Sequence, residues 1–561
     1  MKHALTLATT VIAALALGAA PAAAGDYTVR ACNGFDGNSS WSPEVTNKYA
    51  TAYTDCQGDG LVTRMSGASD GSKAPYGAGA RFVFTSPDDT KIIRIQDLIN
   101  ANGMNGWAAG LVDSKPSWIW GGAPWTTWNT YRETDLWMDT RQLFAQVTCG
   151  DPNGCPRRYL DGLIAMKNIV VTVRDYVGPT VNITGGTVTI PGWHNGGLDY
   201  TFAANDPTGI RQVDVKIDGE PRYGKAGECS DVLARPCTDM ASGGGLPEDA
   251  FGKDGSHVVT ITAFDGSGNA ATASQSVLVD HTAPSPPLDL RLAGGAGWRS
   301  GNDFALMWRN PPQAAAPIIG AHYVICPAGN AGNDTRGCAE GTAYGPDIHG
   351  VANLHVPKPG DWRATVWLED GARNRDSRQA SAVAGLRLDT AAPTLAFSGL
   401  SSADPTRVHV DASDDLSGVA SAQIEAKRQG ESAWRALQTS LDARGFSAVL
   451  DDDALPHGTY DLRARAVDGA GNEHTTEGDA DGNAATRSLP LRVATRLTVG
   501  TPARVMATNS NAKRRYRTVL RVRPQAAFGT TIPLRGRLTT PGANPLAAAD
   551  IEVWERIALP T

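Results

Sequence analysis

Charged side chains are scarce in this sequence, and so are aromatic ones. Only 19% of the 561 residues are charged and 7% are aromatic, whereas glycine (62) and proline (34) are frequent. This composition is typical of a turn-rich β protein and argues against a mainly helical or a disordered chain. The net charge of −7 is modest, so it provides no general attraction to nucleic acid or anionic lipid. The length corresponds to roughly four domains.

Long apolar runs are also missing, except at the N-terminus. A basic start at Met1–His3 precedes an apolar run from Ala4 to Leu17, which is too short to span a bilayer. Ala22-Ala23-Ala24 then offers the small residues that signal peptidase requires. We therefore expect residues 1–24 to be a signal peptide and the protein to be secreted or extracellular, with cell-wall association as a further expectation.

Export predicts disulfides, and the eight cysteines fall in close couples. If the domains fold separately, Cys229 pairs with Cys237 and Cys326 pairs with Cys338. The first four cysteines share one segment and allow three pairings, of which we favour the local one, Cys32–Cys56 and Cys149–Cys155. Zinc would need CxxC-like spacing or added histidine ligands, and neither occurs.

One motif occurs three times in the second half of the chain. It reads Gly, any residue, a ring-bearing residue, seven residues and then Asp-Gly-x-x-Asn. The three copies are Gly255, His257 and Asp265–Asn269; Gly360, Trp362 and Asp370–Asn374; and Gly458, Tyr460 and Asp468–Asn472. The seven residues alternate between apolar and polar, which indicates a strand with one buried face. Asp-Gly after such a strand indicates a tight turn, so we interpret the motif as a scaffold element whose ring fills the core.

Asp-x-x-x-Pro sequences at Asp175, Asp280 and Asp389 divide the chain, because proline ends a strand and stiffens a linker. Loops at Asp206–Gly209 and Asp415–Gly418 also share a spacing and precede alternating strands. The predicted fold is all-β, a series of tandem β-sandwiches. The predicted order is a Trp-rich, jelly-roll-like sandwich over 25–178, an Ig-like domain over 179–283, a fibronectin type III-like domain over 284–391, an Ig-like domain over 392–494 and a partial Ig-like or β domain over 495–561.

Two resemblances extend this organisation. Pro286-Pro287, a core Trp308 and Tyr323 resemble a fibronectin type III domain, although Trp362 stands where a later strand usually carries tyrosine, so we expect no hydroxyl hydrogen bond there. The turns and junctions of residues 179–494 resemble those of secreted, multi-domain Ig-like repeat proteins of actinobacterial type. This resemblance implies extracellular binding or adhesion and supplies no catalytic residues.

The densest tryptophan stretch lies in the first segment. Trp118, Trp120, Trp125 and Trp128 stand among Gly, Pro and Thr residues, where a packed core has little else to use. Exposed aromatic faces suit sugar rings, so these four residues are the candidate ligand-binding residues. We expect Trp107 and Trp137 in the core. The predicted function is binding or adhesion, with this domain as carbohydrate binder, the repeats as a stalk, an extracellular glycan or surface protein as partner, and no nucleic acid.

A glycan-active hydrolase is the competing hypothesis. Glu133, Asp135 and Asp139 lie two apart or four apart and would share one face of a strand. Jelly-roll glucanases carry Glu-x-Asp-x-x-Glu on such a strand, but Met138 occupies the third carboxylate position here, and Asp139 could replace it only through a bulge. We therefore predict no catalytic residues and no enzyme, with a purely structural surface protein as a third alternative.

We predict no cofactor and no metal, with bound Ca²⁺ as the alternative. Asp479-Ala480-Asp481-Gly482-Asn483 begins like an oxygen-ligand loop but lacks the bidentate glutamate that would close it. The repeated Asp-Gly-x-x-Asn turns also carry oxygens, although Asp and Asn are common in turns for backbone reasons alone. The basic cluster Lys513–Arg517 is interpreted as the solvated face of a strand.

Overall fold

The computed structural model describes residues 24–34, 37–115, 117–122, 125–126, 130–313, 315–331, 334–400, 406–452, 454–491, 495–507, 515–522 and 529–539. The expected signal peptide up to residue 23 lies outside these residues, and so do residues 540–561 of the partial domain expected over 495–561. Among them, strands dominate, and the only helical elements are η1 (Thr187–Thr189) and η2 (Glu248–Ala250). No described helix has the length and apolar character to cross a membrane.

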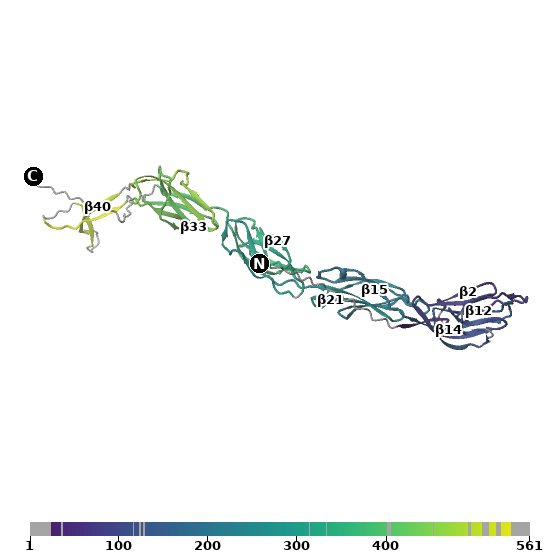
Figure 1. Ribbon diagram of the computed structural model, residues 1–561. Coiled ribbons are helices and arrows are strands. Elements are labelled where there is room, and N and C mark those ends of the chain that lie inside the picture. Colours follow the sequence, from purple (N-terminus) through teal and green to yellow (C-terminus); the bar gives the residue numbers. More distant parts are fainter. Residues whose placement is uncertain are drawn as a thin grey trace, which may run out of the picture. The chain divides into compact units, whose positions relative to one another are not determined.

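Residues 25–175 form a sandwich of two antiparallel sheets (Figure 1). The seven-stranded sheet has the order β10-β7-β14-β4-β3, with β1 pairing β14 and β11 pairing β7. Its strands are β1 (Gly25–Ala31), β3 (Ala50–Asp55), β4 (Gly60–Met65), β7 (Thr90–Gly103), β10 (Trp125–Thr126), β11 (Arg132–Thr140) and β14 (Gly162–Asp175). The five-stranded sheet, in the order β2-β6-β12-β8-β9, comprises β2 (Trp41–Val45), β6 (Gly79–Thr85), β12 (Gln142–Cys149), β8 (Trp107–Asp113) and β9 (Trp118–Gly122). A short ribbon joins β5 (Lys73–Ala74) and β13 (Cys155–Pro156).

The next stretch pairs a three-stranded with a five-stranded sheet. The smaller sheet contains β15 (Thr180–Gly185), β17 (Leu198–Asn205) and β20 (Met240–Leu246). The larger contains β16 (Trp193–His194), β22 (Ala270–Val279), β21 (Gly255–Asp265), β18 (Ile210–Ile217) and β19 (Glu220–Ala226). All pairs are antiparallel except β16 with β22, where a two-residue strand pairs with the last strand of the stretch. This arrangement of strands is that of an Ig-like sandwich.

The same plan recurs further along the chain. One three-stranded sheet contains β23 (Leu288–Leu292), β25 (Phe304–Arg309) and β28 (Gly350–Leu354), and its five-stranded companion contains β24 (Trp298–Arg299), β30 (Arg375–Leu388), β29 (Gly360–Asp370), β26 (Ile318–Pro327) and β27 (Ala339–Tyr344). Here too the two-residue strand, β24, pairs in parallel with β30. The repetition follows from the repeated sequence motif, since β21 and β29 are two of its three copies.

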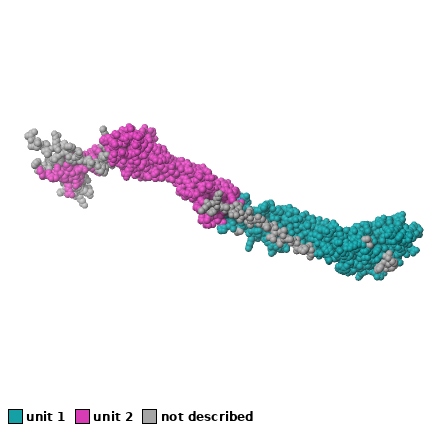
Figure 2. Space-filling view, in the orientation of Figure 1, with its two compact units in different colours: residues 1–284, 312–318, 369–375 teal, residues 285–311, 319–368, 376–561 magenta. Residues whose placement is uncertain are grey.

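Two further groups of strands complete the described residues. One has a four-stranded sheet of β31 (Thr394–Ser398), β32 (Arg407–Ser413), β36 (Gly445–Val449) and β35 (Thr439–Asp442), and a five-stranded sheet of β34 (Arg435–Ala436), β33 (Val419–Arg428), β37 (Gly458–Asp468), β38 (Glu473–Thr476) and β39 (Thr486–Leu489). The last sheet contains β41 (Arg515–Arg521), β40 (Arg496–Ala507) and β42 (Arg535–Thr539). The chain divides into two compact units (Figure 2). The first contains residues 1–284, 312–318 and 369–375, and the second contains residues 285–311, 319–368 and 376–561. The all-β, tandem-sandwich prediction is confirmed.

The repeated motif forms the central strands β21, β29 and β37, and its alternation matches the buried face. The apolar positions are at most 1% exposed; they are Val259, Ile261, Ala263, Ala364, Val366, Leu368, Leu462, Ala464 and Ala466. Each ring residue is also buried, and its polar atom reaches the backbone carbonyl four residues earlier. These contacts are His257 Nε2 with Lys253 O (2.7 Å), Trp362 Nε1 with Lys358 O (3.0 Å) and Tyr460 Oη with Pro456 O (2.8 Å).

Trp362 therefore makes a hydrogen bond at the position where a fibronectin type III domain usually has that of a tyrosine hydroxyl. No hydroxyl is present at this position, as expected, but the indole N–H donates in its place. A buried carbonyl needs a donor, and the chemical identity of that donor is secondary.

Four disulfides join Cys32–Cys56, Cys149–Cys155, Cys229–Cys237 and Cys326–Cys338. These are the local pairings that the sequence favours. Four disulfides fit a protein of an oxidising, extracellular compartment.

Candidate functional site

The predicted tryptophan cluster is divided between the two sheets of the first sandwich. Trp118 and Trp120 lie on β9, at the edge of the five-stranded sheet, where Trp118 is 37% exposed and Trp120 is half-buried against the core. The backbone of Trp125 belongs to β10, which pairs with β7 at the edge of the other sheet. The side chain of Trp125 and all of Trp128 lie outside the described residues. A ligand site made of all four stays a prediction.

Trp107 and Trp137 have opposite environments. Trp107 is fully buried, as expected, and its indole N–H donates to Pro156 O at 2.7 Å. The expected core position of Trp137 is wrong, because this side chain is 67% exposed and its ring lies under the guanidinium of Arg94, 5.0 Å from the ring centre. The strand period could have revealed this, since Trp137 is in phase with Glu133 and Asp135, whose charges require solvent.

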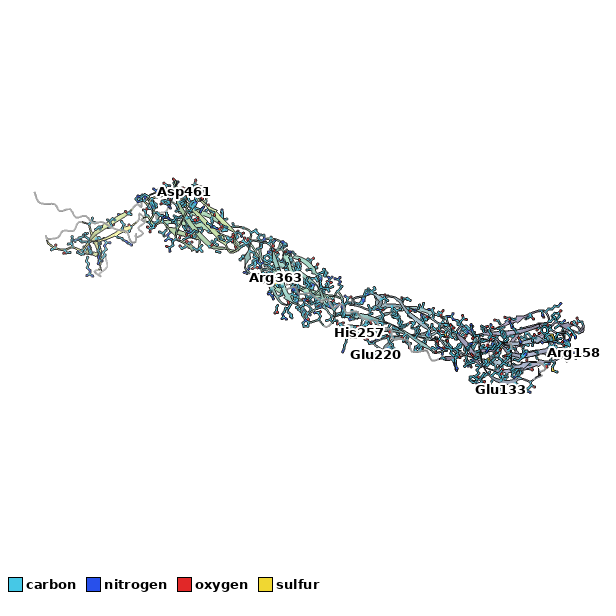
Figure 3. The ribbon with its side chains drawn as sticks, in the orientation of Figure 1. Glu133, Arg158, Glu220, His257, Arg363 and Asp461 are labelled. Atoms are coloured by element: carbon cyan, nitrogen blue, oxygen red, sulfur yellow. A yellow bond between two sulfur atoms is a disulfide. The ribbon has the colours of Figure 1, made fainter. Side chains whose placement is uncertain are left out.

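We call the exposed side chains of β11 the outer face, namely Glu133, Asp135, Trp137 and Asp139; Figure 3 labels Glu133. Asp135 is held there by Arg94, whose Nε and Nη2 donate to its two carboxylate oxygens at 2.7 and 2.5 Å. This pairing holds the pKa of Asp135 below its ordinary value. Both oxygens of Asp135 are thus engaged by the guanidinium of Arg94.

The pattern for a hydrolase is not completed on this strand. Met138 packs against the core, opposite in direction to the outer face. The pairing of β11 with β7 is irregular between Trp137 and Thr140, but Asp139 nevertheless remains exposed on the side of Glu133. The irregularity therefore does not create the third carboxylate position.

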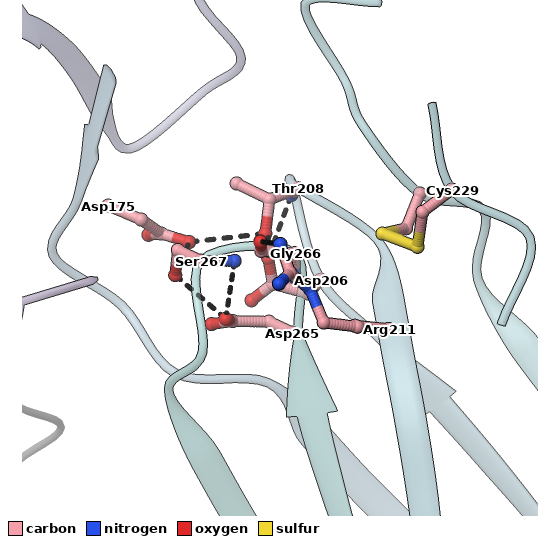
Figure 4. Close-up of a disulfide and its surroundings, with 9 residues drawn as sticks. Asp175, Asp206, Thr208, Arg211, Cys229, Asp265, Gly266 and Ser267 are labelled. Atoms are coloured by element: carbon pink, nitrogen blue, oxygen red, sulfur yellow. Dashed lines mark hydrogen bonds between the residues drawn. A yellow bond between two sulfur atoms is a disulfide. The ribbon is translucent and has the colours of Figure 1, made fainter. Parts of the chain in front are cut away.

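A second cluster, which the sequence interpretation missed, lies where the first sandwich ends. Asp175 ends β14, Asp206 follows β17, and Asp265 ends β21, so three strand ends deliver three carboxylates to one place (Figure 4). One oxygen of each lies within 4.8 Å of the others, and the three residues are 0%, 5% and 0% exposed. We call this group the first junction.

Hydrogen bonds occupy only part of the first junction. Thr208 N and Oγ1 donate to Asp206 Oδ1 at 2.7 and 2.6 Å, and Ser267 N and Oγ donate to Asp265 Oδ1 at 2.9 and 2.7 Å. The Oδ2 atoms of Asp206 and Asp265 are buried and receive no hydrogen bond. Burial raises the pKa of Asp206 to about 6, and the charges of Asp175 and Asp265 act in the same direction.

The corresponding second junction is built from Asp280 and Asp370. Asp280 accepts from Thr282 N (3.0 Å) and Ala316 N (2.7 Å), one at each carboxylate oxygen. Both oxygens of Asp370 also accept, from the backbone and the side-chain amide of Asn374 at 2.9 and 3.0 Å. Residues 311–317 contain no Asp or Glu, so no counterpart of Asp206 exists in this segment.

A third junction again gathers three carboxylates, from Asp389, Asp414 and Asp468, with one oxygen of each within 4.8 Å of the others. The sequence comparison paired Asp206 with Asp415, and this alignment is wrong by one residue, because Asp414 is the member of the cluster and Asp415 is exposed. Asp414 Oδ1 accepts from Gly418 N at 2.7 Å, which draws its carboxylate inward.

The motif asparagines tie the junctions to the chain that precedes them. Asn269 Nδ2 donates to Val177 O (3.1 Å), Asn374 Nδ2 to Asp280 O (2.8 Å) and Asn472 Nδ2 to Asp389 O (2.9 Å). The motif is therefore more than a turn, since its asparagine also holds the linker. The signal in the sequence was the joint recurrence of Asp-Gly-x-x-Asn and Asp-x-x-x-Pro.

The two remaining sequence candidates behave as local surface elements. Asp479 Oδ1 accepts from Asp481 N (3.0 Å) and Asn483 N (2.8 Å), so this carboxylate closes its own turn. In the basic cluster, Arg517 and Arg521 are exposed on β41, and Lys513 and Arg514 lie outside the described residues.

No protein-family model and no curated protein matches the chain. Solved structures with similar strand arrangements include a Ca²⁺-stabilised adhesin of an Antarctic bacterium that binds ice (15% identity, TM-score 0.29, covering 77% of this chain and 98% of that one). A tetra-tandem repeat from the extending region of a large adhesion protein has 14% identity and a TM-score of 0.24, over 75% and 97% of the two chains. Fibronectin(III)-like modules of Clostridium thermocellum CbhA have 9% identity and a TM-score of 0.21, over 38% and 95%.

Proposed function

We propose that this chain is an extracellular binding protein whose first sandwich recognises a carbohydrate and whose following sandwiches act as a stalk. The carrying observation is Trp137, a large aromatic ring that is 67% exposed in the middle of a strand of charged residues. Burying such a ring under a ligand would release water from apolar surface, which favours binding.

The neighbouring strands supply the polar partners that a sugar needs. Gln96 lies opposite Asp135, and Leu98 lies opposite both Glu133 on β11 and Lys167 on β14. Residues that lie opposite one another on paired strands share a face, so amide, ammonium and carboxylate groups lie along the same face of the sheet as Trp137, whose own opposite residue is Arg94. Sugars combine apolar C–H faces with hydroxyl edges, which matches an aromatic ring bordered by such groups.

Further aromatic–cation pairs support the same interpretation. Lys167 Nζ lies 3.9 Å from the ring centre of Tyr131, and the guanidinium of Arg64 lies 5.3 Å from that of Tyr53. These pairs belong to the seven-stranded sheet or to its margin, like Arg94 and Trp137. Cation–π contacts hold aromatic rings in fixed orientations, which reduces the entropy that binding must overcome.

A glycan array with the disulfide-bonded chain 25–561 tests this proposal. We expect Trp137→Ala to weaken binding of any recognised glycan by about tenfold or more, corresponding to about 1.4 kcal/mol. Tyr76→Ala is the matched control, because Tyr76 is 68% exposed but lies outside β11, and it should leave binding unchanged.

Four results would count against the proposal. Failure of the unaltered chain to bind any glycan would contradict it, and so would equal affinities of the Trp137→Ala and unaltered chains. Loss of binding in Trp118→Ala alone would move the site to the edge of the five-stranded sheet. Release of reducing sugar that Glu133→Gln abolishes would instead favour the hydrolase hypothesis.

A further inference from the structure

We propose that the first junction is a calcium site, in which Asp175, Asp206 and Asp265 bind one Ca²⁺ and thereby fasten the first sandwich to the second. The proposal is independent of glycan recognition. It rests on the positions of the carboxylates, on their burial and on the two oxygens without a hydrogen bond.

The three carboxylates come from different parts of the chain. Asp175 ends the last strand of the first sandwich, whereas Asp206 follows β17 and Asp265 ends β21 of the second (Figure 4). Hydrogen bonds already join these parts, since the backbone Arg30 N donates to Asp231 O (2.7 Å) and the side-chain hydroxyl of Tyr27 donates to Ala234 O (2.7 Å). An ion bound by all three carboxylates would therefore add a bond across an existing contact.

The spacing of the oxygens fits one ion. A Ca²⁺–O distance of about 2.4 Å allows two ligand atoms on opposite sides of the ion to be about 4.8 Å apart. One oxygen of each carboxylate lies within 4.8 Å of the other two, which is close to the spacing of ligands that share a single Ca²⁺ ion. The hydroxyls of Thr208 and Ser267, each 3.3 Å from Asp175 Oδ2, add oxygen atoms of the kind that Ca²⁺ accepts.

The electrostatics favour a positive charge in this cluster. Three carboxylates that are at most 5% exposed have little water to solvate them, and within the described residues none of them forms an ion pair with Lys or Arg. Asp206 Oδ2 and Asp265 Oδ2 lack even a hydrogen bond, which a buried polar atom rarely does. A divalent cation supplies the missing partner, and an all-oxygen set without His or Cys selects Ca²⁺ over Zn²⁺.

The second junction has the same turn but no carboxylate oxygen that lacks a partner. Asp280 and Asp370 have a hydrogen-bond donor at every carboxylate oxygen, and the third carboxylate is absent from residues 311–317. We therefore expect no ion there, which makes Asp280→Asn a matched control.

Calorimetric titration of the chelator-treated chain 25–561 with CaCl₂ tests the proposal. We expect the unaltered chain to bind one more Ca²⁺ per molecule than the Asp206→Asn variant, with the Asp280→Asn variant equal to the unaltered chain. Asparagine keeps the shape and the Oδ1 acceptor of Asp206, so the fold should persist. If Asp206→Asn fails to fold, Asp175→Asn serves as the second variant with the same expected loss of one ion.

Hydrogen exchange supplies an independent readout. Ca²⁺ should slow exchange of the amides at Val177, Thr208 and Ser267 at least tenfold in the unaltered chain and leave them unchanged in Asp206→Asn. Equal stoichiometry in both chains would overturn the proposal, as would Mg²⁺ binding without Ca²⁺ binding. Unchanged exchange, together with an Asp206→Asn chain as stable as the unaltered one, would show that a shared proton rather than a metal holds the cluster.

Discussion

The first and second junctions begin from the same sequence elements and satisfy their carboxylates differently. At both, a motif aspartate ends a central strand, a motif asparagine donates to the linker, and the glycine after the aspartate donates to a loop carbonyl, Gly266 N to Gly209 O (3.0 Å) and Gly371 N to Pro317 O (2.8 Å). Of these two junctions, the first has a third carboxylate, and its Asp206 Oδ2 and Asp265 Oδ2 are buried without a donor. The two junctions thus share the same turn. They differ in the loop that ends at Gly209 or at Pro317, because only the first of these loops carries an aspartate, Asp206, whose negative charge needs a partner.

Asp97 sharpens the comparison, because it is a buried carboxylate without acidic companions. It is 5% exposed on β7, Thr134 Oγ1 donates to its Oδ1, and Oδ2 has no partner. Burial raises the pKa of Asp97 from 3.8 to about 7. The folded state then binds a proton that the unfolded state has released between about pH 4 and pH 7, so stability falls as pH rises through this window.

The expected loss is the largest of the three predictions, about 4 kcal/mol for three pKa units. Calorimetric unfolding of the chain 25–561 from pH 4 to 7.5 measures it, and Asp97→Asn should remove the part of the pH dependence that Asp97 contributes. Ca²⁺ should leave that dependence unchanged. If the stability of the unaltered chain does not change over this pH range, Asp97 is ionised in the folded state. Burial then does not make Asp97 differ in protonation from the carboxylates of the first junction.

Gly209→Ala should break the first junction and spare the second. Gly209 has a φ of +75°, and a Cβ there would lie 1.9 Å from Cys237 O in the disulfide loop, so the loop that carries Asp206 must move. We expect a loss of about 2 kcal/mol or more. Pro317→Ala, the matched change at the second junction, should cost below about 1 kcal/mol. Unfolding calorimetry compares the two variants, and equal losses would contradict the assigned role of Gly209.

Asn269→Ala and Asn374→Ala should have small effects of similar size. Each removes a side-chain hydrogen bond to a linker carbonyl, worth about 1 kcal/mol, and a second one within the turn, to Ser267 Oγ (2.8 Å) or to Asp370 Oδ2 (3.0 Å). Local hydrogen exchange at Val177 and Thr282 measures the loosening of the two linkers. Asn195→Ala, at an exposed position, is the control and should change stability by less than about 0.5 kcal/mol. Loosening at one linker only would show that the asparagine has different roles in the two junctions.

Much of the fold was predictable because its signals are local. Period-two alternation identified the buried residues of β21, β29 and β37, and Asp-Gly marked the turns that follow them. The exposure of Trp137 was also encoded by its phase with Glu133 and Asp135, but the usual burial of tryptophan outweighed the period in the interpretation. A charged strand face requires solvent, and this requirement extends to any ring in phase with it.

By itself, the sequence determined the all-β class, the repeated strand and turn, and the local cysteine couples, because each depends on residues near one another in the chain. Only the tertiary structure decided that Asp175, Asp206 and Asp265 meet, since their approach depends on which strand ends lie together. The tertiary structure also decided that Asp414, and not the neighbouring Asp415, belongs to the third junction. The loop directs the side chain of Asp414 to the cluster and leaves Asp415 exposed. Spacing along the chain specifies hydrogen bonds within a turn, whereas the electrostatic demand of a buried cluster arises only when separate loops pack against one another.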